Sequence, residues 1–194
     1  MIKGLILFCA SKEILIAIIG VAGTLFGTVV GWLLNFLQQK GKLNIYVNYG
    51  LNMKFETADN VPAESRDKVE CFSYDIVLDI YNASGNTKIM REVEIWFYNN
   101  KDVIKKDIPK DNSKTKIEGG IFIHYDVEMI NVPAKSGRQL LLHNYFWKDE
   151  MDFIWNVTFI KLHYKNEKGK AKEIVIEKKD YSKYKFEALN YDNR

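Results

Sequence analysis

Three histidines, His124, His143 and His163, have the most obvious chemical use, because imidazole binds metal ions and exchanges protons near neutral pH. Metal sites usually show two ligands at a short spacing along the chain. Each histidine falls in a different predicted strand, and none has a partner at such a spacing. We therefore expect histidines that are partly exposed on strands, and no metal site.

Nucleophiles and carboxylates give equally weak signals. Ser136 lies in a Lys-Ser-Gly turn without the flanking glycine of a nucleophile elbow, and Cys71 is expected to be a small core or edge residue. Asp75 and Asp79 share the outward face of one predicted strand and offer oxygen ligands to a cation, although solvated carboxylates are the favoured interpretation. No glycine-rich loop has the form of a phosphate-binding motif. The sequence thus predicts no catalytic residue and no cofactor, and we expect a protein that is not an enzyme.

Aromatic side chains are the better candidates for a binding surface. They make up 13% of the chain, which is more rings than a small core needs. Tyr145, Phe146 and Trp147 lie together in or beside a predicted connection between strands. Such rings bury a large area at low entropic cost, so we name these three residues as a candidate partner surface. The alternative is that they complete the core or rest on lipid headgroups.

The placement of charge argues against a nucleic-acid partner. The chain has 28 basic and 25 acidic residues, of which four lysines and one glutamate lie in residues 1–42. The remaining body therefore holds 24 residues of each sign. A nucleic-acid surface needs clustered excess Lys and Arg. We expect a mixed, solvated surface and no nucleic-acid binding.

Cysteine usage limits the chemistry further. Of the two cysteines, Cys9 precedes the apolar segment and Cys71 lies in the body. The body therefore has no internal disulfide, and a multi-cysteine zinc site is excluded. A reducing compartment is compatible with this pattern.

Residues 14–37 contain no charged side chain. Such a segment gives roughly 36 Å of helix, against about 30 Å of bilayer hydrocarbon. A cleavable signal peptide has a shorter apolar core and a small-residue cleavage site, and residues 38–42 offer no such site. We expect a short N-terminal tail over residues 1–12 and one transmembrane helix over residues 13–38, with Trp32 near the interface. The lipid bilayer is then a partner.

The predicted transmembrane helix has two unlike faces. At about 100° per residue, small and weakly polar residues gather on one arc, and bulky apolar residues lie opposite. Small residues let two helix backbones approach closely, and an asparagine can hydrogen-bond across the contact. We therefore predict a homo-oligomer whose helix–helix contact consists of Gly20, Gly23, Thr24, Gly27, Thr28, Gly31 and Asn35.

The basic groups that flank this helix are nearly equal in number on its two sides, so they decide little about its orientation. Lys3, Lys12 and the α-amino group lie on one side, and Lys40 and Lys42 lie on the other. A tail of about a dozen residues is short enough to be translocated, and the body lacks a disulfide. These two points favour a cytoplasmic β domain.

Residues 43–180 alternate between apolar and polar residues and turn frequently. About eight strands, with no convincing helix between them, predict an antiparallel β-sandwich or a small β-barrel. Residues 121–129 and 153–163 are each expected to form one strand, and residues 181–194 a C-terminal tail or short helix. The clearest strand puts five apolar side chains on one face: Phe72, Tyr74, Ile76, Leu78 and Ile80.

Two stretches of the body resemble bacterial immunoglobulin-like sandwiches. A strand ending in Asn-Ala-Ser-Gly-Asn (residues 82–86) and followed by residues 89–97 looks like the second and third strands of such domains. Residues 132–137 are similar to their proline-lysine-glycine turn before a late strand. The resemblance covers residues 70–180, points to bacterial single-pass membrane proteins carrying such a sandwich, and implies a fold without an activity. An antibody-type domain is not indicated, because no cysteine pair brackets a tryptophan.

These observations predict a single-pass, membrane-anchored binding or sensor module that self-associates through its helix and binds an unknown protein or ligand. One alternative is a membrane-perturbing effector whose β domain senses a signal and clusters the helices. Another is an envelope-side module that binds glycan or protein.

Overall fold

The computed structural model describes the backbone of residues 2–186 and the side chains of residues 12–186. The chain forms two units, Met1–Gly41 and Lys42–Arg194. The C-terminal part of the expected tail, residues 187–194, lies outside the described residues.

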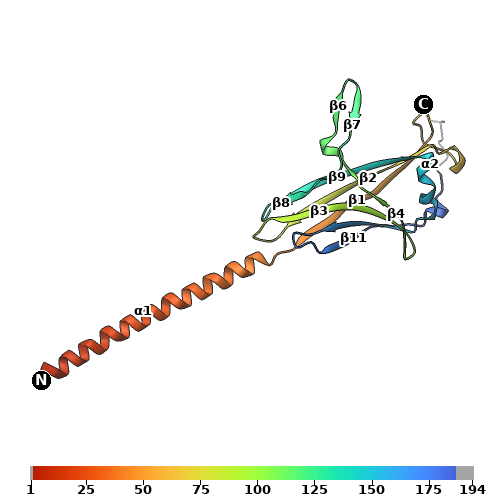
Figure 1. Cartoon of the computed structure of the whole chain (residues 1–194). Coiled ribbons are helices and arrows are strands. Elements are labelled where there is room, and N and C mark those ends of the chain that lie inside the picture. Colours follow the sequence, from red (N-terminus) through yellow and green to blue (C-terminus); the bar gives the residue numbers. More distant parts are fainter. Residues whose placement is uncertain (1, 187–194) are drawn as a thin grey trace, which may run out of the picture. The chain divides into compact units, whose positions relative to one another are not determined.

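The first unit is one helix, α1 (Ile2–Gln39), drawn in red and orange in Figure 1. Within it, residues Lys12–Gln39 are long and apolar enough to cross a membrane. The helix begins at Ile2, before the boundary expected at residue 13, so residues 2–12 of the expected tail continue it. That stretch contains no proline, and its leucines, alanine and lysines are good helix formers that outweigh the single Gly4.

The second unit is a sandwich of two antiparallel sheets, which confirms the predicted β-sandwich and excludes the barrel alternative for the described residues. The first sheet has the order β1-β2-β9-β5, with bounds Leu43–Glu56, Cys71–Asn82, Gly137–Trp147 and Lys110–Asp111. The second has the order β11-β10-β3-β4, with bounds Ala171–Lys178, Phe159–Lys165, Lys88–Asn99 and Asp102–Asp107. A short strand, β8 (Ile130–Val132), also pairs with β3.

The core forms between the two sheets, and β2 supplies its centre. The five residues predicted to share one face of this strand are all fully buried. Strand β2 lies between β1 and β9, and its register with both is continuous except for a bulge in β1 between Asn48 and Leu51. Tyr49 and Gly50 form that bulge with positive φ angles of 60° and 73°. A bulge on an edge strand discourages pairing with another chain.

Strand β3 departs from simple alternation. Residues 89–97 were expected to keep one phase, yet Met90 and Val93 are both buried while the two residues between them are exposed. Glu92 has a φ of 51°, and the register with β10 shifts between His163 and Lys165. A bulge therefore inserts one extra residue and moves Met90 into the core.

Two expected strands are shorter than predicted. The first residues of the expected strand 153–163 form a 3-10 helix, Asp152–Asn156. This helix lets the neighbours Ile154 and Trp155 both be buried, which a strand could not do because adjacent strand residues face opposite sides. A single helical turn, α2 (Lys148–Met151), precedes it. Residues 121–129 form a strand only at Ile121–Ile123. A last 3-10 turn, Tyr181–Lys183, packs Tyr181 into the core.

One buried polar contact joins the two sheets. Tyr74 on β2 donates its hydroxyl hydrogen to the carboxylate of Asp107 on β4, and Asn144 on β9 donates to the same carboxylate at 2.9 and 3.0 Å. Burial raises the pKa of the Tyr74 phenol well above its usual value, and the neighbouring Asp107 charge adds to this shift. The phenol therefore stays a hydrogen-bond donor throughout the physiological range.

A second buried polar cluster centres on Asn82 at the end of β2. Its Nδ2 donates to the carbonyl oxygens of Asn86, Val132 and Pro133 at 2.8, 2.9 and 2.9 Å. Its Oδ1 accepts from the backbone N–H and the hydroxyl of Ser84 at 2.9 and 2.7 Å. The cluster ties the β2–β3 turn to the turn that follows β8.

We expect Asn82→Ala to lower the free energy of unfolding by about 2–3 kcal/mol, because it leaves several buried backbone groups without partners. The matched control Asn131→Ala removes an exposed amide from β8 and is expected to change stability by less than about 0.5 kcal/mol. Urea unfolding of the full chain in detergent micelles, followed by tryptophan fluorescence, measures both. Equal losses in the two variants would contradict this assignment.

Candidate functional site

Strand β9 carries the three aromatic residues named as a partner surface, and its alternation separates them. Tyr145 and Trp147 point outward and are 43% and 56% exposed, whereas Phe146 points inward and is only 4% exposed. Phe146 stacks on Phe72 with 4.9 Å between ring centroids. The prediction that Phe146 belongs to an exposed surface is therefore wrong, because neighbouring residues of a strand face opposite sides.

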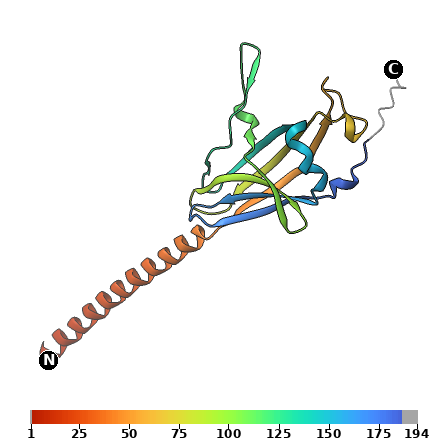
Figure 2. The ribbon, with the colours of Figure 1, turned by 45° about the vertical axis from the view of Figure 1, so that its right-hand side comes forward.

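A hairpin projects from the sandwich beside β9. Its strands are β6 (Lys116–Glu118) and β7 (Ile121–Ile123), and Figures 1 and 2 both show it standing away from the sheets. Gly119 and Gly120 make the turn with positive φ angles of 59° and 82°, as a two-residue hairpin requires. Three large apolar side chains of this hairpin are 65%, 69% and 62% exposed: Ile117, Ile121 and Phe122.

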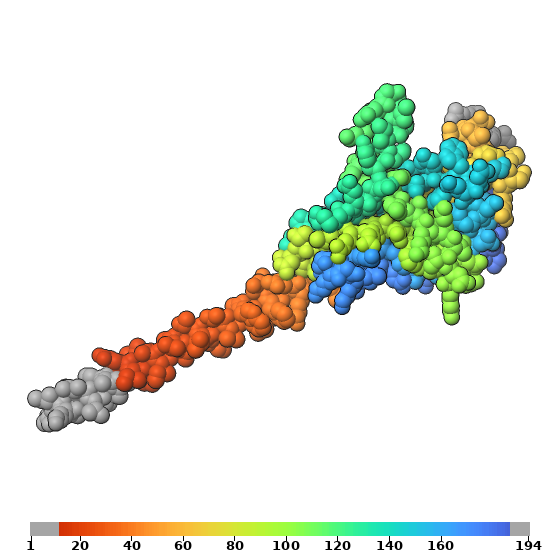
Figure 3. Space-filling model, viewed as in Figure 1, coloured from red at the N-terminus to blue at the C-terminus, as the bar shows by residue number. Residues whose placement is uncertain are grey.

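The base of the hairpin is held to the first sheet. The backbone N–H of Asp111 donates to the Tyr125 carbonyl at 2.9 Å, and that of Val127 donates to the Pro109 carbonyl at 2.9 Å. The buried Asp111 carboxylate accepts from the backbone N–H of Ser113 at 3.1 Å. These bonds fix the two ends of the projecting segment. Figure 3 shows this segment standing out from the rest of the domain.

Five rings run from the hairpin along β9, and we call them the ring ladder: Phe122, His124, His143, Tyr145 and Trp147. Successive ring centroids are 6.3, 5.0, 6.1 and 6.1 Å apart. These separations allow contact between neighbouring rings. The ring ladder therefore joins the apolar hairpin and the outer face of β9 into one continuous surface.

Two histidines form the middle of the ring ladder. The Nδ1 atom of His124 lies 3.0 Å from the Thr115 hydroxyl, and the Nδ1 atom of His143 lies 3.7 Å from a carboxylate oxygen of Asp75. Burial lowers the pKa of His143; Asp75 opposes this shift, and His124, Lys54 and Lys110 add to it. His143 is therefore neutral at physiological pH and can lie against a second imidazole.

Metal binding gains no support from the described residues. Among the described residues, no group of three or more His, Cys, Asp or Glu side chains is placed to hold a metal ion. Asp79, one of the two candidate cation ligands, accepts hydrogen bonds from Asn48 at 2.8 Å and from Gln139 at 3.0 Å. Asp75 faces Lys54 at 3.7 Å as well as His143.

The other residues singled out for chemistry have structural roles. The Ser136 hydroxyl donates to the Pro133 carbonyl at 2.8 Å within its turn. Cys71 is a buried free thiol whose pKa is raised by burial, which makes it a poor nucleophile. His163 lies on the other sheet, where it stacks on Trp96 at 3.8 Å and contacts the Tyr98 hydroxyl at 2.9 Å.

The small-residue face of α1 is open within its own unit. A Cβ atom added at Gly20, Gly23, Gly27 or Gly31 would meet nothing within 4 Å. The hydroxyls of Thr24 and Thr28 donate at 2.9 Å to the carbonyl oxygens four residues earlier, at Gly20 and Thr24. Asn35 accepts a hydrogen bond from Gln39 at 3.2 Å. This face is thus smooth, and its hydroxyl donors are already used.

The contact between His124 and His143 was missed by sequence reasoning, because it joins distant residues on different elements and no local spacing reports it. The hairpin did leave a signal. Gly119 and Gly120 separate two short apolar-containing stretches, which is a recognised hairpin pattern. The two glycines lie in or beside a longer polar stretch, and for that reason the hairpin was not predicted.

The fold now defines the class of protein: an immunoglobulin-like β-sandwich that follows an apolar N-terminal helix. The model of the YopI Ig-like domain family matches residues 41–177, and the chain belongs to this family. This confirms the resemblance found in the sequence.

Two known proteins show how far the similarity extends. The SPbeta prophage-derived uncharacterized protein YopI of Bacillus subtilis (strain 168) is 25% identical over 164 residues, covering 81% of this chain and 92% of that protein. A crystal structure of a Bordetella pertussis protein assigned as ApaA is 10% identical, covering 71% of this chain and 89% of that one, with a TM-score of 0.33. That structural overlap is too low to inform the site.

We expect the free energy of unfolding to fall as the pH is lowered from 7.5 to 5. Burial lowers the pKa values of His143 and His163 in the folded chain, so the unfolded chain binds more protons below about pH 6.5. Urea unfolding at several pH values measures this slope. His143→Gln should make it shallower, and the double variant with His163→Gln shallower still. A slope unchanged in both variants would contradict the assignment.

Proposed function

We propose that this protein is a single-pass, membrane-anchored module, without enzymatic activity, whose Ig-like domain binds a partner protein through the ring ladder and the β6–β7 hairpin. The observation that carries this proposal is a pair of exposed apolar groups, at the hairpin and at Tyr145 and Trp147 of β9, which ring contacts through His124 and His143 connect. Exposed apolar surfaces of this kind usually mark interaction sites.

A protein partner fits this surface better than a small molecule. The rings are spread along a strand and a projecting hairpin, with successive centroids 5.0 to 6.3 Å apart, so they offer an extended surface. Tyrosine and tryptophan anchor protein interfaces because they bury area at low entropic cost. Among the described residues, β6 and β7 pair only with each other, so their outer edges are free to hydrogen-bond with a strand of the partner.

The helix supports the second part of the proposal, self-association in the membrane. Its small face has no bulky side chain to keep two backbones apart, and van der Waals packing then favours close approach. Assembly of the helices would bring several Ig-like domains together and strengthen binding to a multivalent partner. A cytoplasmic location of the domain is part of this proposal and is consistent with its single, buried cysteine.

The partner site is tested by photo-crosslinking in cells, with a photoreactive amino acid in place of Trp147. We expect one discrete adduct that disappears in the Ile121→Ser, Phe122→Ser variant, because these changes remove apolar area from the adjoining hairpin. A probe at Val175, an exposed apolar residue on the other sheet, is the matched control. Identical adducts from both probes, or an adduct that survives the hairpin changes, would contradict the site.

Self-association is tested by crosslinking of the full chain in membranes. We expect Gly23→Ile, Gly27→Ile and Gly31→Ile together to reduce the crosslinked species at least about tenfold, because the added side chains separate the backbones. Val21→Ile and Val29→Ile enlarge the opposite face and should leave crosslinking unchanged. If the glycine variant crosslinks like the original chain, this face does not mediate assembly.

A further inference from the structure

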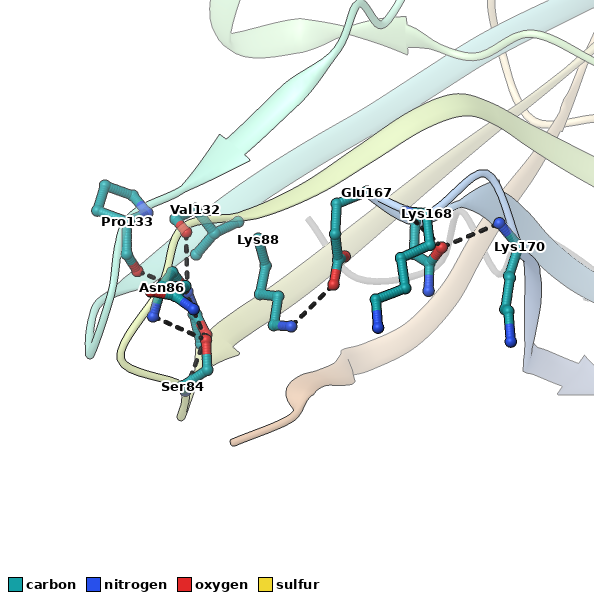
Figure 4. Close-up of polar contacts among 10 residues, drawn as sticks. Ser84, Asn86, Lys88, Val132, Pro133, Glu167, Lys168 and Lys170 are labelled. Carbon is teal, nitrogen blue, oxygen red and sulfur yellow. Dashed lines mark hydrogen bonds and ion pairs between the residues drawn. The ribbon is translucent and has the colours of Figure 1, made fainter. Parts of the chain in front are cut away.

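Three turns meet at the end of the sandwich from which β1 starts. The backbone N–H of Ala83 in the β2–β3 turn donates to the Lys42 carbonyl at 3.0 Å, and the Lys135 N–H donates to the Ser84 carbonyl at 3.2 Å. The β10–β11 turn joins them through an ion pair of 2.8 Å between Lys88 and Glu167 (Figure 4). These contacts place segments far apart in the sequence at one end of the domain.

This end is strongly basic. We call it the basic end and define it as Lys42 with residues 82–92, 135–138 and 165–172. It contains nine basic residues and two acidic ones. Both acids are already engaged, Glu167 with Lys88 and Glu92 with Lys165. Seven exposed basic residues of this end therefore have no carboxylate neighbour among the ion pairs of the described residues: Lys42, Arg91, Lys135, Arg138, Lys168, Lys170 and Lys172.

The opposite end of the sandwich has no such excess of basic residues. The β1–β2 connection and the turn after β9 lie there, at the other ends of the strands that start or finish at the basic end. Residues 56–70, 148–152 and 178–185, which lie at this end, together hold nine acidic and seven basic residues. The excess of basic residues is therefore confined to the basic end, within a body that holds 24 residues of each sign.

We propose that the basic end docks on the anionic headgroups of phospholipids in the membrane that holds α1. This inference rests on the membrane anchor in the proposed function, but not on the ring ladder. Only residues 40–42 connect the last residue of α1 to the first residue of β1, and covalent geometry limits their reach to about 15 Å. The end of the domain that carries the excess charge is therefore also the end that the connection keeps near the bilayer surface.

The strength of such docking follows from its charge. Each Lys or Arg close to an anionic membrane strengthens binding by about fivefold, and salt screens the attraction over about 10 Å. Because the domain is already tethered, even a modest attraction suffices to hold it at the surface. Anionic headgroups give the cytoplasmic leaflet its negative potential, so this docking also favours a cytoplasmic domain.

Energy transfer from a dye on the domain to acceptor-labelled lipids tests the proposal. The full chain carries Cys9→Ser and a donor dye at Ala134→Cys, an exposed position of the basic end, while the buried Cys71 stays unlabelled. It is reconstituted in nanodiscs of phosphatidylcholine alone or with phosphatidylglycerol at about 3:1. We expect greater transfer in the anionic discs, and a return to the neutral level in high salt. A dye at Ala58→Cys, at the opposite end of the sandwich, should show no increase.

Charge reversal separates docking from a general charge effect. Lys135→Glu, Lys168→Glu and Lys170→Glu together should lower the ratio of docked to undocked domain by at least about 100-fold in anionic discs. The matched control changes three exposed lysines elsewhere and should keep the anionic-lipid response: Lys101→Glu, Lys178→Glu and Lys185→Glu.

Three results would overturn docking alone, and a fourth would show that α1 does not anchor the chain in the membrane. Transfer at Ala134 that ignores lipid charge, or that falls equally in both triple variants, would contradict docking. Duplex DNA that binds the basic end and abolishes the lipid response at physiological salt would instead assign it to nucleic acid. Release of the chain from membranes by alkaline carbonate would overturn the anchor itself, and docking with it.

Discussion

The alternation of β2 is the constraint on which the rest of the domain depends. Five consecutive inward positions of this strand are fully buried, and β2 is paired along its length with β1 on one side and β9 on the other. Because a one-residue slip would exchange the two faces of a strand, the phase of β2 sets the phase of both neighbours. Asp75 then faces outward beside His143, and Ser73 beside Tyr145. The outer part of the ring ladder is thus a direct consequence of how the core is packed.

This packing leaves two distinct surfaces, which differ in chemistry and position. The ring ladder and the hairpin form an apolar surface at the outer side of β9, whereas the basic end gathers exposed lysines and arginines from three turns. The Asn82 cluster holds two of those turns together, and the ion pair between Lys88 and Glu167 adds the third. A domain held at a membrane by its basic end would keep the ring ladder available to a partner.

Local patterns of apolar, charged and turn-forming residues were sufficient to predict most of the fold. The uncharged run of residues 14–37 predicted the apolar helix, and the turn at residues 82–86 supported the immunoglobulin-like resemblance. Features that depend on contacts between distant parts of the chain could not be predicted from the sequence. The bulge at Glu92 reverses the phase that placed Ile89 inward, and the 3-10 helix around Trp155 follows from burial of adjacent residues. For the candidate site, Tyr145 and Trp147 were found, but Phe146 was placed on the wrong side and the contact between His124 and His143 was missed.

The proposed function places the Ig-like domain at the cytoplasmic face of the membrane that holds α1. Labelling of a cysteine at the exposed Ala58 position, in a chain with Cys9→Ser, is the decisive measurement of this proposed placement. A membrane-impermeant maleimide should leave the cysteine unmodified in intact cells and modify it fully once the cells are permeabilised. Full labelling in intact cells would place the domain on the outer side and contradict the account.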